Sequence, residues 1–153
     1  MEKQGIKVMA RNREAYHEYF VEEEMEAGIE LCGTEVKSIR QGTLNLKDAW
    51  CGIKDGELLI NQMHISPYEH GNRFNPDAKR VRRLLMHKRE IMRLYGKVKQ
   101  DGFALIPLSV YFKGSRVKVK VGLCKGKKLH DKRQAEAERD AKRQIERAMK
   151  ERY

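Results

Sequence analysis

The chain has 153 residues, a length that suits one compact domain with a short extension. Its formal net charge of +11 and its pI near 9.7 are typical of a protein with a polyanionic partner, either nucleic acid or membrane. No apolar run approaches the roughly 18 residues of a membrane span, and the first residues lack the apolar stretch of a signal peptide, so we expect no membrane association.

The charge is unevenly distributed along the chain. Residues 14–35 hold eight acidic residues and no lysine or arginine, whereas residues 79–93 hold seven basic residues and one acidic residue. Residues 113–153 hold fifteen basic and six acidic residues. This separation predicts a surface with one charged face rather than a uniformly solvated one.

The first third of the chain has the pattern of short antiparallel strands. Residues 1–13 are polar and basic, and we expect them to be irregular. Glu26-Ala27-Gly28 can turn the chain, which predicts an antiparallel hairpin of residues 16–25 with 28–32.

A short helix and a second hairpin follow. Thr34 can cap a helix over residues 35–41, which Gly42 would end. Asp55-Gly56 lies between the apolar runs 48–53 and 58–65, which is a strong hairpin signal. Residues 66–80 contain two prolines and are predicted to form a surface loop.

The second half of the chain predicts one longer helix and two strands. Residues 87–99 carry an apolar stripe of Ile91, Tyr95 and Val98, and His87 can cap their start. A strand over residues 103–112 follows, in which Pro107 indicates an edge or a bulge.

Residues 116–124, RVKVKVGLC, show the clearest pattern in the chain. Apolar residues at 117, 119, 121 and 123 alternate with Arg116, Lys118 and Lys120, so the cations share one face of a strand. Because a strand rises about 3.3 Å per residue, neighbouring cations lie about 6.6 Å apart, a spacing comparable to that of phosphates in a nucleic-acid strand. A solvated outer face of a barrel strand is the alternative interpretation.

Together these elements predict a mainly β, α+β fold. Strands this short would leave exposed edges in a flat sheet, so we expect a six-stranded antiparallel barrel of the oligonucleotide-binding (OB) type, with two to three external helices. We assign residues 1–128 to this RNA-binding barrel domain and residues 129–153 to a basic C-terminal tail.

The tail has a helical composition but little apolar surface. Residues 132–153 contain neither glycine nor proline, and Asp131 can cap a helix there. Only Ile145 and Met149 would gain more than about 1 kcal/mol by burial, and an isolated helix of about 20 residues is marginal in water. We therefore expect a tail that is disordered in the free protein and helical against a polyanionic surface.

No catalytic or metal-binding pattern stands out. The five histidines share no metal-ligand spacing, there is no Cys-x-x-Cys, and Cys32, Cys51 and Cys124 have the character of small core residues in a reducing cytoplasm. We expect no cofactor, no metal and no enzymatic activity. Glu22 and Glu24 on one strand face leave a metal-dependent RNA-processing enzyme as an alternative.

Several stretches in order resemble one known family: HEYFVEEEMEAGIELCGTEVKSIRQG (17–42), RVRRLLMHKREI (80–91) and VKVKVGLCKGKKLHDKR (117–133). They are similar to small protein B, the SsrA-binding protein family of bacterial trans-translation. Its members bind transfer-messenger RNA (tmRNA, the SsrA RNA) and accompany it to stalled ribosomes. The resemblance implies an OB-like barrel and tmRNA and the ribosome as partners.

The resemblance also implies site residues. The family's tmRNA contacts fall at Asn12, Glu26, Leu85 and Lys118 of this sequence. The matching motifs add further candidates: Arg13, Arg80, Arg82, Arg83, Arg116 and Lys120. The resemblance does not show which of the three arginines in the segment 80–83 contacts RNA.

A second set belongs to the ribosome. The family places the segment His130 to Arg133 at the decoding centre of the small subunit, beside 16S rRNA, with the tail running along the empty mRNA channel. The candidates there are Lys127, Lys128, His130, Asp131, Lys132 and Arg133.

We therefore expect a monomeric, non-enzymatic adaptor that delivers tmRNA to the A site of stalled ribosomes. A general OB-type RNA chaperone or ribosome-associated protein is the alternative, and it predicts equal affinity for unrelated RNAs.

Overall fold

The computed structural model describes residues 5–69, 75–127 and 143–144. Its strands are β1 (Ile6–Arg11), β2 (Tyr19–Ile29), β3 (Leu44–Asn45), β4 (Trp50–Lys54), β5 (Glu57–Asn61), β6 (His64–Ile65), β7 (Arg82–Leu85), β8 (Ala104–Lys113) and β9 (Arg116–Gly126). Its helices are α1 (Arg13–Glu18), α2 (Gly33–Arg40) and α3 (Lys88–Asp101).

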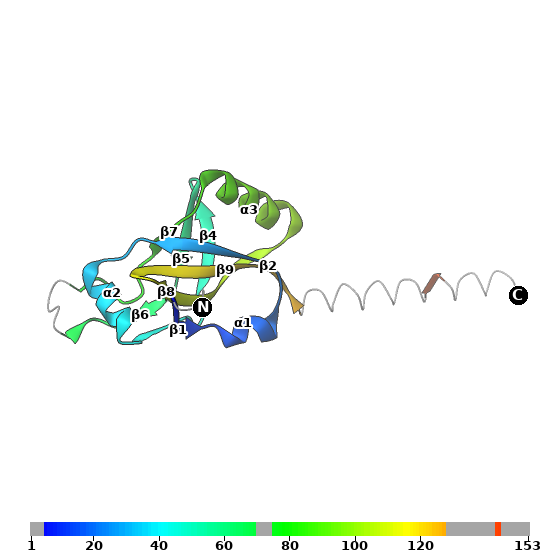
Figure 1. The fold of residues 1–153 in the computed structure, drawn as a ribbon. Helices are drawn as coiled ribbons and strands as arrows, with labels where there is room; N and C mark the ends of the chain where they lie inside the picture. The colour runs from blue at the N-terminus through cyan, green and yellow to red at the C-terminus, as the bar shows by residue number, and fades with distance from the viewer. Residues whose placement is uncertain (1–4, 70–74, 128–142, 145–153) are drawn as a thin grey trace, which may run out of the picture.

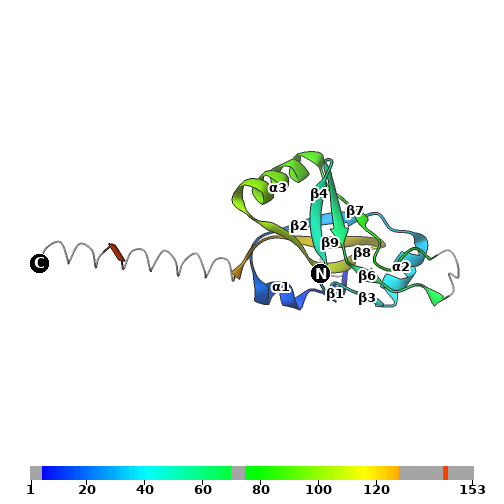
Figure 2. The same cartoon turned by 180° about the vertical axis from the view of Figure 1, so that it is seen from behind.

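Six strands close into an antiparallel ring (Figures 1 and 2). The order around the ring is β8–β4–β5–β7–β2–β9, and β9 pairs again with β8. Strand β1 joins β8 outside the ring, and β3 pairs with β6 in a separate two-stranded sheet. The predicted six-stranded barrel with external helices is therefore confirmed.

Strand β8 makes this closure possible because it pairs with three neighbours. It lies along β9 from end to end, while β4 pairs with it at Leu105 and β1 pairs with it from Ser109 to Lys113. The β8–β9 register shifts between Pro107 and Ser109, which is a bulge. The proline thus marks a bulge in a central strand rather than an edge, since a bulge tolerates the missing N–H and bends the strand.

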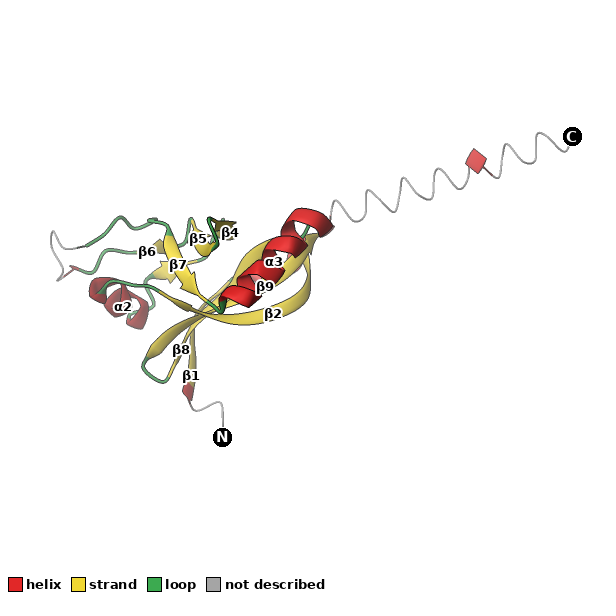
Figure 3. Cartoon of the chain, turned by 90° about the horizontal axis from the view of Figure 1, so that it is seen from above, coloured by secondary structure: helices red, strands yellow, loops and turns green. Residues whose placement is uncertain are grey.

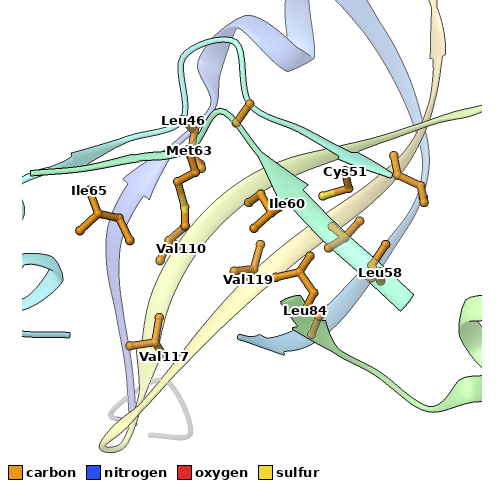
Figure 4. Packing of buried hydrophobic residues seen from close by; sticks show 14 of the residues in the cluster. Leu46, Cys51, Leu58, Ile60, Met63, Ile65, Leu84, Val110, Val117 and Val119 are labelled. Carbon is orange, nitrogen blue, oxygen red and sulfur yellow. The ribbon is translucent and has the colours of Figure 1, made fainter. Parts of the chain in front are cut away.

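Apolar side chains fill the barrel (Figure 4). Val119 and Val121 are fully buried, and Val117 is 9% exposed, so the alternation predicted for β9 is confirmed. They meet buried side chains from β4, β5, β7 and β8: Cys51, Leu58, Ile60, Leu84 and Val110. Burial of each such aliphatic side chain contributes roughly 1.5–3 kcal/mol.

The helices cover different sides of the barrel. Figures 1 and 2 place α1 and α3 on opposite sides, and Figure 3 shows α3 lying across β2. The buried residues of α3 are Ile91 and Leu94, which face the barrel. Arg93 on the same helix pairs with Glu23 on β2 at 2.7 Å.

The β4–β5 hairpin confirms the prediction made from Asp55-Gly56. Both residues have positive φ angles, 53° and 78°, as the two central positions of a type I′ turn require. Among its described residues, the loop predicted over 66–80 also holds no α-helix or strand.

Two predictions near the N-terminus are wrong. Residues 6–11 form β1 instead of an irregular arm, and residues 13–18 form α1. The hairpin of 16–25 with 28–32 does not exist, because β2 runs unbroken through Glu26-Ala27-Gly28. Those three residues pair with β9 on one side, and Gly28 also pairs with β7 on the other, so the chain has no freedom to turn there.

Two helix starts differ in detail from expectation. Helix α2 begins after Cys32, and the Glu35 carboxylate accepts a hydrogen bond from the Cys32 N–H at 2.9 Å, so Thr34 is not the cap. His87 occupies the N-cap position of α3, but its side chain makes no capping hydrogen bond.

Cys51 and Cys124 are core residues as predicted, whereas Cys32 is exposed. The predictions for the tail, residues 129–153, lie outside the described residues except at the helical positions 143–144. No helix in the described part of the chain is long and apolar enough to cross a membrane.

Candidate nucleic-acid interface

The outer face of β9 carries the predicted row of cations. Arg116 is exposed, and Lys118 and Lys120 are partly exposed, because the valines between them point into the barrel. Lys120 lies 3.6 Å from the Glu24 carboxylate on β2. Among residues 5–69 and 75–127, no carboxylate lies within ion-pair distance of Arg116 or Lys118.

Leu85, Gly28 and Lys118 form a row across three neighbouring strands. Gly28 on β2 pairs with Leu85 on β7 and with Lys118 on β9. A Cβ added to Gly28 would lie 3.3 Å from the Leu85 Cβ, so the leucine lies over bare backbone. Leu85 is nevertheless 45% exposed. An apolar side chain packed over glycine backbone and a cation therefore lie side by side on the surface.

Glu26 shares the outer face of β2 with Gly28, since the two are separated by two positions. Its Oε2 accepts a hydrogen bond from the Tyr111 hydroxyl at 2.6 Å, and Lys113 Nζ lies 3.5 Å from Oε1. The hydrogen bond from Tyr111 is the main reason that the pKa of Glu26 is lowered, and Lys113 and Lys118 add to the effect. Glu26 is therefore an ionised hydrogen-bond acceptor beside the row.

A hollow of about 700 Å³ opens next to Glu26, between β2 and the start of α3. Its lining combines two methionines with charged side chains from the first turn of the helix: Met25, Glu26, Met86, His87, Lys88, Arg89 and Glu90. A volume in the range of about 300–1,000 Å³ suits a ligand of nucleobase size or larger. The hollow places Glu26 where it can meet the edge of an unstacked base.

Arg82 is fully buried, which corrects the expectation that it contacts RNA. Its Nε donates to Glu35 Oε2 at 2.6 Å, and its terminal nitrogens donate to the carbonyl oxygens of Met63 and Ala78 at 2.8 and 3.0 Å. Each of its three nitrogens donates inside the protein, and a fully buried guanidinium cannot reach a phosphate. Alternation along β7 explains the difference: Arg82 and Leu84 point inward, whereas Arg83 and Leu85 point outward.

Arg80 and Arg83 reach the surface, but both are paired. Arg80 donates to Glu35 at 2.6 and 3.1 Å, and Arg83 bridges Glu30 and, at 3.2 Å, Glu57. Burial acts to raise the pKa of Glu35, but the hydrogen bonds from Arg80, the Cys32 N–H and Arg82 outweigh it and keep the pKa low. Arg80 and Arg82 thus join the segment 80–82 to α2 through Glu35, whereas Arg83 joins β7 to Glu30 and to β5.

Asn12 lies away from the row, in a different hollow that Trp50 and Glu18 also line. Its Oδ1 caps α1 by accepting from the Ala15 N–H at 3.2 Å, and its Nδ2 donates to the Pro107 carbonyl at 3.0 Å. The asparagine therefore fixes α1 to β8, and the exposed Arg13 follows it on the helix. The structure does not bring these two residues together with Glu26, Leu85 and Lys118.

Lys127 marks the place where the chain leaves the barrel. Its Nζ donates to the Tyr16 carbonyl at 3.0 Å and lies 5.2 Å from the centre of the Phe20 ring. The other ribosome candidates lie outside the described residues: Lys128, His130, Asp131, Lys132 and Arg133.

The described part of the chain contains no group of three or more His, Cys, Asp or Glu side chains arranged to hold a metal ion. The carboxylates of residues 22–24 do not form one either. Glu23 is held by Arg93, and Glu24 lies near Lys120 and accepts from Tyr16 at 3.4 Å.

Comparison with known proteins agrees over nearly the whole chain. The family described as "SmpB protein" matches residues 9–151. The chain belongs to the SmpB family. An "SsrA-binding protein" of Carboxydothermus hydrogenoformans is 58% identical over 147 residues, which cover 96% of this chain and 99% of that protein. One from Clostridium perfringens is 60% identical over 146 residues, which cover 95% of this chain and 94% of that protein.

A solved SmpB structure has the same fold. It is described as "tmRNA-SmpB: a journey to the center of the bacterial ribosome" and matches with a TM-score of 0.65 and 44% sequence identity. The match covers 80% of this chain and 85% of that one.

Sequence reasoning missed two residues of the site in this SmpB family member. Tyr111 on β8 reaches Glu26 on β2 across β9, because the two registers place Tyr111 opposite Lys118 and Glu26 opposite Lys120. The sequence predicts a turn at Gly28, whereas in the structure Gly28 permits the close approach of Leu85. No local sequence pattern signals either relationship, since both depend on strand pairing between distant segments.

Proposed function

We propose that this chain binds tmRNA through the barrel and delivers it to the A site of stalled ribosomes in trans-translation. The observation that carries the proposal is the row of Leu85, Gly28 and Lys118 beside Glu26, on a chain that belongs to the SmpB family. The relatives' name, SsrA-binding protein, and the solved tmRNA–SmpB structure on the ribosome support the same assignment.

The chemistry of the row fits folded RNA better than a plain phosphate track. Lys118 and Arg116 supply the cations that phosphates require. Leu85 offers an apolar surface to an unstacked base or a sugar, and the Glu26 carboxylate accepts from base N–H groups. Unstacked bases occur in loops of folded RNA, where they can leave the helix.

The acidic residues of the interface argue against general RNA binding. Glu24 and Glu26 lie on the same face as the cations, so they disfavour any RNA whose phosphates would lie close to these carboxylates. A non-specific RNA chaperone gains affinity from uncompensated cations, so a mixed surface lowers its affinity for most RNAs. The same mixture favours one RNA whose shape matches it.

The remainder of the proposal concerns the segment after the barrel. The segment 125–133, which includes Lys127 and carries five cations, connects the barrel to the decoding centre. The tail occupies the empty mRNA channel, where the phosphates of the channel wall favour its positive charge. The protein acts as a monomer in the cytoplasm and catalyses no reaction itself, because peptide transfer belongs to the ribosome.

A binding comparison tests the proposal against its alternatives. Dissociation constants are measured for tmRNA, bulk tRNA and a random structured RNA at one fixed salt concentration, about 0.15 M. The proposal expects clear preference for tmRNA. Equal constants for the three RNAs would support a chaperone instead, and cleavage of any of them in the presence of Mg²⁺ would support a metal-dependent enzyme.

A further inference from the structure

Tyr111 is a buried residue with one polar atom at the surface of the proposed site. It lies on β8 opposite Lys118 on β9, so it extends the row of Leu85, Gly28 and Lys118 to a fourth strand. The residue is 5% exposed, and its hydroxyl donates to Glu26 Oε2 at 2.6 Å. The two residues are 85 positions apart in the sequence.

This hydrogen bond constrains a side chain that would otherwise be free. A glutamate on the outer face of a strand rotates about three bonds, whereas a tyrosine hydroxyl on a buried ring has a nearly fixed position. Lys113 Nζ lies 3.5 Å from the other carboxylate oxygen. The carboxylate is thus held from the β8 side. Glu26 also lines the hollow at the start of α3, and each carboxylate oxygen can accept a second hydrogen bond.

We infer that Tyr111 is a positioning residue for RNA recognition: it holds the Glu26 carboxylate in the orientation that accepts hydrogen bonds from nucleobase N–H groups. The inference rests on the proposed function, because it takes folded RNA as the ligand of this face. Fixing the acceptor before binding removes part of the entropy cost of ordering it in the complex.

The base edges that fit are those with adjacent or exocyclic N–H donors. A carboxylate accepts from the N1 and N2 groups of guanine or from the N4 amino group of cytosine. It repels a phosphate in the same position. By fixing the carboxylate, Tyr111 increases the preference of this part of the surface for a base edge over the RNA backbone.

Two isosteric variants provide the test and its control. Tyr111→Phe removes one hydroxyl and keeps the buried ring. Tyr16→Phe is the matched control, since it also removes a tyrosine hydroxyl that donates to a glutamate of β2, here Glu24 at 3.4 Å. We expect Tyr111→Phe to weaken tmRNA binding about tenfold, the order expected for a hydrogen bond to a charged group, and Tyr16→Phe to leave it unchanged.

A double-mutant cycle shows whether Tyr111 acts through Glu26. In the Glu26→Gln background, Tyr111→Phe should have little further effect on tmRNA affinity, because the carboxylate that it positions is already gone. An equal loss in both backgrounds overturns the inference, since Tyr111 would then act on the RNA independently. So does wild-type affinity of Tyr111→Phe.

The pKa of Glu26, followed by NMR of the carboxyl carbon in the free protein, is a readout that needs no RNA. Loss of the hydroxyl should raise this pKa, and an unchanged pKa contradicts the positioning role. The wild type and Tyr111→Phe share the other ionisable side chains around Glu26. These are Glu24 on β2, Lys113 on β8, Lys118 and Lys120 on β9, and His87, Lys88, Arg89 and Glu90 at the start of α3.

The outcome separates this inference from the proposed function. If the wild-type protein prefers tmRNA but Tyr111→Phe binds equally well, the function stands and the role of Tyr111 falls. If the wild-type protein shows no preference among RNAs while the pKa of Glu26 responds to Tyr111→Phe, the proposed function fails, although the contact between the two residues is real.

Discussion

Arg82 and Glu35 form a buried ion pair at 2.6 Å between segments that are 47 positions apart in the chain. The arginine side chain is fully covered and the glutamate side chain is 3% exposed. Because Arg82 also donates to the carbonyl oxygens of Met63 and Ala78, one side chain joins β7, the start of α2 and both ends of the segment 63–78. Its position supports the interface without forming part of its surface.

Arg82→Met should destabilise the protein strongly. Removing one partner of a buried ion pair leaves the other charge under-compensated and typically costs about 3–5 kcal/mol. Arg80 still contacts Glu35 in this variant, so we expect about 3 kcal/mol in urea unfolding. Arg83→Met is the matched control next in sequence. Its exposed ion pairs predict a loss below about 1 kcal/mol, and equal losses for the two variants would contradict this assignment.

Glu35 should make stability depend on pH. Its folded pKa is lowered, so its stabilising contribution is fully present above the unfolded pKa, about 4.3, and is lost as the pH falls through the folded value. The free energy of unfolding of the wild type should therefore exceed that of Glu35→Gln most near neutral pH. Urea titrations between about pH 7 and pH 3 measure this difference, and a difference that stays constant over the range would contradict the prediction.

Lys118→Glu should abolish tmRNA binding, because it replaces the cation of the row with a second carboxylate near Glu26. We expect a loss of at least about a hundredfold in affinity, as for a reversed charge at a nucleic-acid interface. Lys54→Glu has the same charge change at the exposed end of β4 and serves as the control. Electrophoretic mobility shift at fixed salt measures both. Similar losses in the two variants would indicate that total charge, and not this row, determines binding.

Gly122→Ala should destabilise the barrel, whereas Gly126→Ala on the same strand should not. A Cβ at Gly122 would lie 2.8 Å from Leu108 Cδ1 and 3.0 Å from Cys124 Sγ, both in buried side chains, whereas none of the described atoms lies within 4 Å of a Cβ at Gly126. Overpacking of this kind costs about 1–3 kcal/mol. Thermal unfolding of the two alanine variants measures the difference, and two equally stable variants would show that Leu108 can move away.

Truncation after Lys128 should separate the two proposed activities. The row on β2, β7 and β9 lies entirely before this residue, so the shortened protein should bind tmRNA with wild-type affinity. Tagging of stalled translation products should cease, because the tail that would enter the decoding centre is gone. If the truncated protein instead loses affinity for tmRNA, the barrel and the tail do not divide the work in this way.

The closed barrel could be predicted from local patterns because its signals are local. The alternation of valines and cations in β9 fixes which face is buried, and Asp55-Gly56 specifies a hairpin by its backbone preference alone. The continuity of β2 could not be predicted in this way. Glu26-Ala27-Gly28 has the composition of a turn, and only pairing with β7 and β9 keeps it extended.

The residues of the site also differ in whether local sequence or pairing between distant segments determines their position. Lys118 and Arg116 could be placed on the outer face from β9 alone, and the resemblance to a known family pointed to Leu85 and Glu26. The burial of Arg82 and the contact between Tyr111 and Glu26 depend on partners 47 and 85 positions away. In a chain with many arginines, composition cannot separate one that supports the fold from one that faces the solvent.

Strand β9 carries Lys118 near its start, and Lys127 follows directly after its end. Nine residue-to-residue steps separate them, about 30 Å at the usual rise of a strand. Hydrogen bonds from β2 and β8 keep this span stiff. The number of residues in β9 therefore sets the distance between Lys118 in the proposed RNA site and Lys127 at the end of the barrel. Inserting one residue between them would lengthen this distance and would also turn every side chain beyond the insertion to the opposite face of the strand.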